Sequence, residues 1–141
     1  MTEQTLEQIY QNHTGKVSDK WTIYLEEYDR VFCAYRHKPI RMLEIGIQNG
    51  GSLEIWAKYF EQAEQFVGSD INPDCANLVY DDARIKVVIG DATGNDAAAQ
   101  IFSLVSAFDI VLDDGSHRSS DIIKSFARYF PKMVEIGRAH V

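Results

Sequence analysis

The sequence predicts an α/β protein with a doubly wound parallel sheet that is incomplete, at about four strands. Two observations carry this prediction. From residue 41 onward, short runs rich in Val, Ile or Phe alternate with helix-like segments, and the first of these runs enters a glycine-rich turn directly. Short, continuously apolar strands are typical of parallel sheets that helices cover on both faces.

The elements follow one another in a regular order. Residues 6–35 are predicted to be helical because apolar residues recur there at steps of three and four, and Pro39 ends this segment. The predicted strands are 41–45, 65–69, 85–89 and 108–112, and the predicted helices are 52–60, 73–81, 96–105 and 119–130. Right-handed crossovers place every strand-to-helix turn at one edge of such a Rossmann-like sheet. We therefore expect Gly46, Asp70, Asp91 and Asp113 to meet in one crevice.

Three regions are predicted along the chain. Residues 1–38 are expected to form an N-terminal helical lid, and residues 39–134 a partial Rossmann-like core. Residues 135–141 resemble the in-frame translation of a common sequencing adapter, so we expect them to be a non-native tail on a truncated gene. The fourth strand would then be an uncovered apolar edge, which predicts association between copies.

The composition of the chain argues against nucleic-acid and membrane partners. The formal net charge of −7 argues against nucleic-acid binding, which needs a clustered cationic surface. No apolar run is long enough to span a bilayer and the first residues are polar, so we expect a cytoplasmic protein without a membrane partner. Cys33 and Cys75 lie in unrelated segments and are expected to be reduced thiols.

The turn after the first strand has the spacing Glu44-x-Gly46-x-x-x-Gly50. Glycine lets the backbone approach a ligand at the end of a strand, and the following helix directs its positive N-terminus there. The dinucleotide spacing Gly-x-Gly-x-x-Gly is absent, which disfavours an NAD-dependent dehydrogenase and favours an adenosyl ligand without a pyrophosphate. Glu44 lies inside the strand and needs a donor, either a ligand ammonium or an amide of the turn.

Two acidic residues end the next strands. Asp70 is placed to accept hydrogen bonds from the ribose hydroxyls of a nucleoside, and Asp91 from an adenine amino group. Each has a purely structural alternative. Asp70 could cap the segment that begins at Pro73, and Asp91 could simply begin a turn.

A second motif follows the fourth strand, with Asp113, Asp114 and His117 close together. Carboxylate oxygens suit Mg²⁺, and a neutral imidazole can remove the proton of a hydroxyl group. In the alternative interpretations, His117 forms only a local hydrogen bond, and Asp113 orients the loop or touches the methionine part of the cofactor. A metal-dependent hydrolase would leave the glycine turn and Asp70 without a purpose.

Residues 40–134 resemble class I S-adenosylmethionine-dependent methyltransferases in the glycine turn and in the acids Asp70 and Asp91. Together with Ser18–Trp21 and Tyr24–Tyr28, the Asp114-Gly-Ser-His117 element resembles metal-dependent O-methyltransferases of macrolide sugars such as macrocin and mycinamicin, and related cephalosporin-modifying proteins. The resemblance implies Asp114 as a metal ligand and His117 as the general base. It also implies a Glu-Asp pair at the end of the next strand, which this sequence lacks.

The expected function is that of an S-adenosylmethionine-dependent O-methyltransferase, assisted by Mg²⁺ and acting on a hydroxyl of a small, sugar-containing metabolite. Glu44, Gly46, Gly50, Asp70, Asp91 and Asp113 are the expected cofactor-binding residues. The alternative is a catalytically incomplete fragment that binds an adenosyl cofactor without turning it over.

Overall fold

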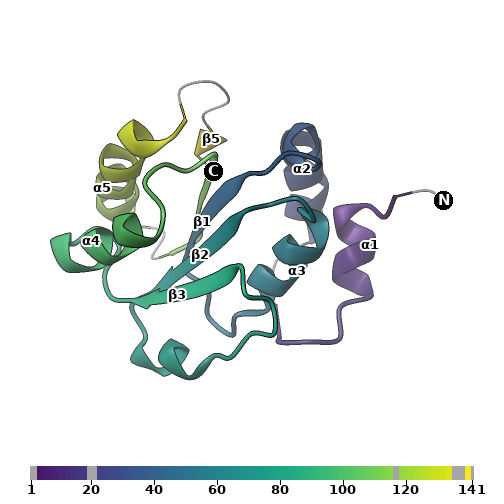
Figure 1. Ribbon diagram of the computed structural model, residues 1–141, viewed down its shortest axis with the longest axis horizontal. Helices are drawn as coiled ribbons and strands as arrows, with labels where there is room; N and C mark the ends of the chain where they lie inside the picture. The colour runs from purple at the N-terminus through teal and green to yellow at the C-terminus, as the bar shows by residue number, and fades with distance from the viewer. Residues whose placement is uncertain (1–2, 19–21, 116–117, 135–138, 141) are drawn as a thin grey trace.

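A parallel sheet in the order β3-β2-β1-β4-β5 forms the centre of the computed structural model (Figure 1), which describes residues 3–18, 22–115, 118–134 and 139–140. Its strands are β1 (Arg41–Ile45), β2 (Gln65–Asp70), β3 (Ile85–Ile89), β4 (Ile110–Asp113) and β5 (Ala139–His140). The strand β1 pairs in parallel with both β2 and β4. The strand order therefore reverses at β1, where open α/β sheets form their ligand-binding crevice.

Helices cover both faces of this sheet (Figure 1), which confirms the doubly wound arrangement predicted from the sequence. The helices α1 (Leu6–Gln11), α2 (Thr22–Phe32) and α3 (Gly51–Tyr59) lie on one side, and α4 (Asn95–Leu104) and α5 (Ser119–Tyr129) on the other. Short 3₁₀ turns occupy Cys33–Tyr35, Pro73–Asn77 and Phe130–Lys132. Within the described residues, no helix combines the length and apolarity needed to cross a bilayer.

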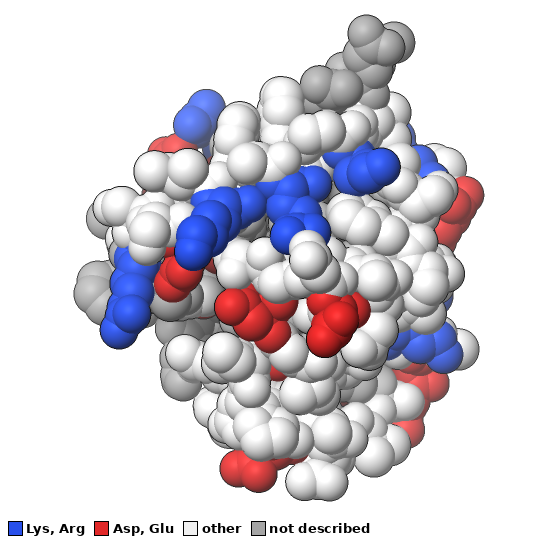
Figure 2. Space-filling view, turned by 90° about the vertical axis from the view of Figure 1, so that its left-hand side faces the viewer, with Lys and Arg blue, Asp and Glu red and all other residues white. Residues whose placement is uncertain are grey.

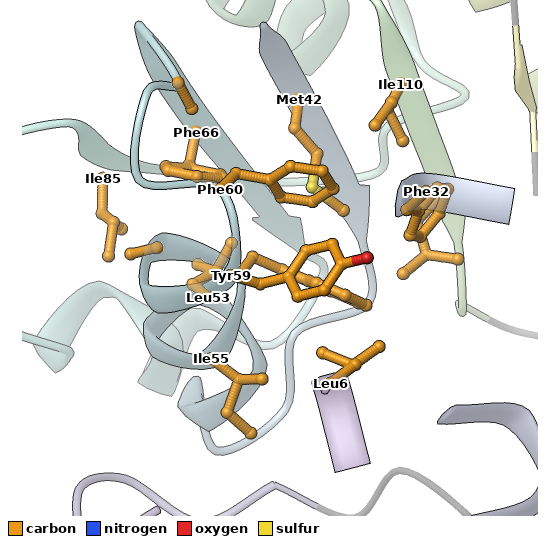
Figure 3. Close-up of a cluster of buried hydrophobic side chains, with 14 of the residues drawn as sticks. Leu6, Phe32, Met42, Leu53, Ile55, Tyr59, Phe60, Phe66, Ile85 and Ile110 are labelled. Atoms are coloured by element: carbon orange, nitrogen blue, oxygen red, sulfur yellow. The ribbon is translucent and has the colours of Figure 1, made fainter. Parts of the chain in front are cut away.

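Each face of the sheet has its own buried cluster. On the side of α1, α2 and α3, large side chains from strands and helices meet (Figure 3), among them Leu6, Phe32, Met42, Tyr59, Phe60 and Phe66. On the side of α4 and α5, the cluster includes Val67, Ile101, Phe108, Val111 and Tyr129. Burial of these side chains removes apolar surface from water and fixes the sheet between two helical layers.

The N-terminal region differs from its prediction as one helical segment. The helix α1 ends at Gln11, and the chain then crosses the start of α3 before α2 begins. There the Lys16 amide donates to Glu54 Oε1 at 2.6 Å, and the Gly51 amide donates to the carbonyl of Val17 at 2.9 Å. These tertiary bonds compete with helix formation. The helices still pack into the core through buried Leu6 and Phe32, and their role as a lid stays a prediction.

The helix expected over 73–81 is also shorter, because only Pro73–Asn77 forms a 3₁₀ turn. Asn72 caps it by accepting a hydrogen bond from the Asp74 amide. The backbone becomes extended at Leu78, which lets the Tyr80 hydroxyl donate to the carbonyl of Gly50 at 2.8 Å.

The expectation that β4 would be an uncovered edge is wrong at two positions. Ala139 pairs with Ile110 and His140 with Val111, and Phe108 forms a bridge with Met133. A strand with unpaired amides and carbonyls accepts a parallel neighbour readily, and here the end of the same chain supplies it. The sheet thus has one strand more than the predicted four.

Candidate cofactor-binding site

A cavity of about 320 Å³ opens at the carboxyl ends of β1, β2, β3 and β4. Gly46 follows β1, Asp70 ends β2, Asp91 follows β3 and Asp113 ends β4, and all four residues line this cavity. The parallel sheet brings them together although they are far apart in the sequence. The prediction that the residues at the ends of these four strands meet in one crevice is therefore confirmed.

The two glycines of the first turn have positive φ angles, +86° at Gly46 and +82° at Gly50. A Cβ at Gly46 would collide with the backbone carbonyl of Asp114, and a Cβ at Gly50 with the hydroxyl of Tyr80. At both positions, glycine is therefore required by a close contact with another segment of this chain and not by a contact with a ligand. Gly46 lines the cavity, whereas Gly50 is not among its lining residues and instead precedes α3.

Asp70 holds the glycine turn in place. Its Oδ2 accepts hydrogen bonds from the amides of Ile47 and Gln48, both at 2.9 Å. Its Oδ1 accepts from the amide of Asn72 at 2.9 Å, so the carboxylate also shapes its own turn. Gln48 has a φ of +47°, a left-handed conformation that these bonds help to maintain. Asp70 therefore has a structural role, and it also faces the cavity.

Asp91 begins a turn, as its structural alternative predicted, and lines the cavity as well. Its Oδ1 accepts from the amide of Thr93 at 2.9 Å and from the Thr93 hydroxyl at 2.7 Å. These bonds lower the pKa of Asp91, and the charges of Lys124 and Arg128 act in the same direction. Figure 2, which views the side of α4 and α5, shows basic side chains in a band above a group of acidic ones.

Glu44 does not lie at the cavity, where a cofactor-binding residue is expected. It is fully buried and is not among the residues that line the cavity. Its carboxyl group accepts hydrogen bonds from the Ser52 hydroxyl and, at 2.9 Å, from the Trp56 indole nitrogen. Both of these donors lie on α3, so Glu44 fixes α3 against β1.

The acidic motif after β4 forms the other wall of the cavity. Asp113, Asp114 and Gly115 all line it. Asp113 Oδ1 accepts from the Gly115 amide at 3.2 Å, which orients the loop, and the Asp114 amide donates to the carbonyl of Ile45 at 2.8 Å. His117 lies outside the described residues. Within the part of the chain that the structure describes, no three His, Cys, Asp or Glu side chains form a potential metal site.

The structure adds residues that the sequence did not single out. Ser69 in β2 and Thr93 after β3 line the cavity, and so do Asp121 and Ser125 on α5. Asp121 and Ser125 are four residues apart and lie on one face of the helix, a spacing that the sequence does display. Nothing in the sequence marks that face as the one that meets the cavity.

No protein-family model matches the sequence. Mycinamicin VI 2''-O-methyltransferase of Micromonospora griseorubida is 36% identical over 115 residues, which cover 77% of this chain and 28% of that protein. Demethylmacrocin O-methyltransferase of Streptomyces fradiae is 35% identical over 115 residues, with the same two shares of 77% and 28%. An 8-demethyl-8-alpha-L-rhamnosyl tetracenomycin-C 2'-O-methyltransferase of Streptomyces olivaceus is 30% identical over 125 residues, or 82% of this chain and 32% of that protein. The chain is a homologue of these sugar O-methyltransferases.

Solved structures agree with this homology. MycE methyltransferase from the mycinamycin biosynthetic pathway, in complex with Mg and S-adenosylhomocysteine (SAH), superposes with a TM-score of 0.77 at 30% identity. The match covers 94% of this chain and 35% of that one. A second MycE structure, with Mg, SAH and mycinamycin VI, gives a TM-score of 0.68 at 35% identity over 79% of this chain and 31% of that one. This methyltransferase homologue therefore spans about a third of the length of its relatives.

Proposed function

We propose that this chain carries the S-adenosylmethionine-binding part of an O-methyltransferase that acts on a hydroxyl of a sugar-containing small molecule. One observation carries the proposal. The tips of four adjacent parallel strands line one cavity, in a chain homologous to a methyltransferase, MycE, that has been solved with SAH and Mg. The same homology supports a sugar-containing small molecule as the acceptor, since relatives are named for substrates such as a rhamnosyl tetracenomycin and an olivosyl-oleandolide.

Asp70 and Asp91 would hold the adenosyl part. A carboxylate has about four acceptor positions, and the described residues fill three of those on Asp70. The remaining one can accept from a ribose hydroxyl. Asp91 receives both Thr93 bonds on Oδ1. Its Oδ2 forms no hydrogen bond within the described residues, and it can therefore accept from the adenine amino group.

Asp114 is proposed as a ligand of Mg²⁺ and His117 as the general base, both by resemblance to the sugar O-methyltransferases. The fit to a metal is incomplete, because the described residues offer the neighbouring carboxylates Asp113 and Asp114 but no group of three potential ligands. When bound, a Mg²⁺ ion would lower the pKa of the acceptor hydroxyl. The contribution of the chain itself is to hold the cofactor and the acceptor in one cavity, which replaces a bimolecular encounter by a positioned one.

A second candidate function is binding of an adenosyl cofactor without turnover. It is favoured by the incomplete set of potential metal ligands within the described residues. The expected cytoplasmic location, the association of copies and the lack of nucleic-acid or membrane partners remain predictions.

The test has two steps. Calorimetry with SAH should show saturable binding by the purified chain. Methyl transfer from labelled S-adenosylmethionine to mycinamicin VI should then be measured with Mg²⁺ and with EDTA. Metal-dependent transfer would support the enzyme, and binding without transfer would support the second candidate. Failure to bind SAH would contradict both.

The proposed base can be tested in a version extended to the full length of the relatives. There, His117→Ala should abolish turnover while SAH affinity changes little. Retained turnover would remove His117 as the base.

A further inference from the structure

Two serines that line the cavity have buried hydroxyl groups with no hydrogen-bond partner among the described residues. Ser69 is 0% exposed and Ser125 is 2% exposed, and both residues line the cavity. Within the described part of the chain, neither Oγ atom forms a hydrogen bond. Buried hydroxyls are nearly always paired, because leaving one unpaired costs free energy. Two such groups on one cavity indicate that a molecule entering it supplies the missing partners.

The two hydroxyls come from adjoining walls. Val67 belongs to the buried cluster on the side of α4 and α5, so Ser69, two residues further along β2, points to that same side of the sheet. Ser125 lies on α5, which covers this side, one helical turn after the cavity-lining Asp121. The unpaired groups therefore mark the part of the cavity between the sheet and α5.

The polarity of the residues around this part of the cavity determines which chemical group of a ligand can bind there. The cavity is also lined by the apolar residues Ile45 and Ala92. A neutral, flat group with hydrogen-bond acceptors on its edge can be buried here at low cost. A carboxylate cannot, because neutral hydroxyls do not compensate the loss of its hydration and the aspartates that line the cavity repel it. Of the parts of an adenosyl cofactor, the purine ring meets this description and the methionine part does not.

We propose that the hydroxyls of Ser69 and Ser125 donate hydrogen bonds to ring nitrogens of the adenine and so select a purine cofactor. The inference rests on the proposed function, and it adds two binding residues to Asp91 on the adenine. The hydroxyls complete their hydrogen bonding only when the cofactor is bound.

The first test uses Ser69→Ala and Ser125→Ala in the whole chain, with SAH affinity measured by calorimetry. Each variant should bind SAH about three- to tenfold more weakly, the loss expected for one net hydrogen bond. Ser103→Ala is the control, because Ser103 is exposed on α4 and its hydroxyl already donates to the carbonyl of Gln100 at 2.6 Å. The Ser103→Ala variant should bind SAH with the same affinity as the unmutated chain.

The ligand-free melting temperature separates binding from a structural role. Removing a hydroxyl that has no partner loses no protein hydrogen bond, so Ser69→Ala and Ser125→Ala should melt at the same temperature as the unmutated chain or higher. A lower melting temperature would mean that these hydroxyls stabilise the fold, and the inference would be overturned.

The second test uses SAH analogues in which one purine ring nitrogen is replaced by C–H. For each serine, one analogue should bind the Ala variant and the unmutated chain equally, because the partner nitrogen is gone. If every analogue is still weakened by the substitution, the hydroxyl contacts another part of the cofactor and the assignment to adenine is wrong.

The outcomes also separate this inference from the proposed function. Equal SAH affinity of both variants and the unmutated chain would show that the hydroxyls bind only water, which overturns the inference and leaves the function standing. Lack of SAH binding by the unmutated chain would overturn both.

Discussion

The fully buried carboxyl group of Glu44 accepts a hydrogen bond from the indole nitrogen of Trp56 at 2.9 Å, which ties the first strand to the helix after the glycine turn. Glu44→Gln would place an NH₂ group against one of the donors on α3, the Ser52 hydroxyl or the Trp56 indole. We expect a loss of about 1–3 kcal/mol in the free energy of unfolding, measured by urea denaturation, because a buried donor is left unpaired. Glu61→Gln, at an exposed position, is the control and should change little.

The same variant decides between two roles of Glu44. Because Glu44 is not among the residues lining the cavity, folded Glu44→Gln should still bind SAH. If the folded variant lost SAH binding altogether, the carboxyl group would have to contact the cofactor directly, as the sequence first indicated.

Asp70→Asn tests the link between the glycine turn and the ribose. An asparagine has only one oxygen acceptor, so it cannot serve Ile47, Gln48 and Asn72 and also bind a ribose hydroxyl. We expect SAH affinity to fall by about tenfold or more, which corresponds to about 1.4 kcal/mol or more. Asp74→Asn, an exposed neighbour outside the cavity lining, is the matched control.

SAH analogues that lack a ribose hydroxyl test whether Asp70 contacts the ribose. An SAH analogue that lacks the bound ribose hydroxyl should be affected less by Asp70→Asn than SAH is. An equal effect on SAH and on analogues lacking either hydroxyl would assign Asp70 a structural role alone.

Gly46→Ala tests the contact between the loops after β1 and β4. Its φ of +86° is unfavourable for alanine, and the new Cβ would collide with the carbonyl of Asp114. We expect a destabilisation of about 1–3 kcal/mol in thermal or urea unfolding. Gly115→Ala, in the loop after β4, is the control, since its Cβ would meet its nearest neighbours only at 3.4 Å and 3.5 Å. Equal stability of the two variants would contradict the argument.

The strands could be predicted because each is a short apolar run that ends in glycine or aspartate. The observed β1 and β3 have the predicted bounds, and β2 is longer by Asp70. The convergence of Gly46, Asp70 and Asp91 followed from topology alone, since parallel strands with right-handed crossovers end at one edge.

The remaining features depend on tertiary contacts that no local pattern reveals. The break after α1 depends on Glu54, which accepts a hydrogen bond from the Lys16 amide. The buried positions of Ser69 and Ser125 depend on how α5 lies over the sheet. Serine occurs on surfaces and in turns too often for its presence to indicate a binding residue. Glu44 illustrates the converse, because its need for a donor was predictable and the identity of that donor was not.

Thr93 should control the acid titration of Asp91. The Thr93 hydroxyl donates to Asp91 Oδ1 at 2.7 Å, and this bond is the main cause of the lowered pKa of Asp91. A carboxyl group with a depressed pKa in the folded state contributes stability above its unfolded pKa of about 3.9, and this contribution is lost as the pH falls through the folded pKa. Thr93→Val should therefore raise the pKa of Asp91 towards its ordinary value, whereas Thr93→Ser should keep it low. The measurement is an NMR titration of the Asp91 carboxyl carbon below about pH 5, around its ordinary pKa. An unchanged pKa in Thr93→Val would mean that the Thr93 amide, Lys124 and Arg128, and not the hydroxyl, hold the carboxylate in its charged form.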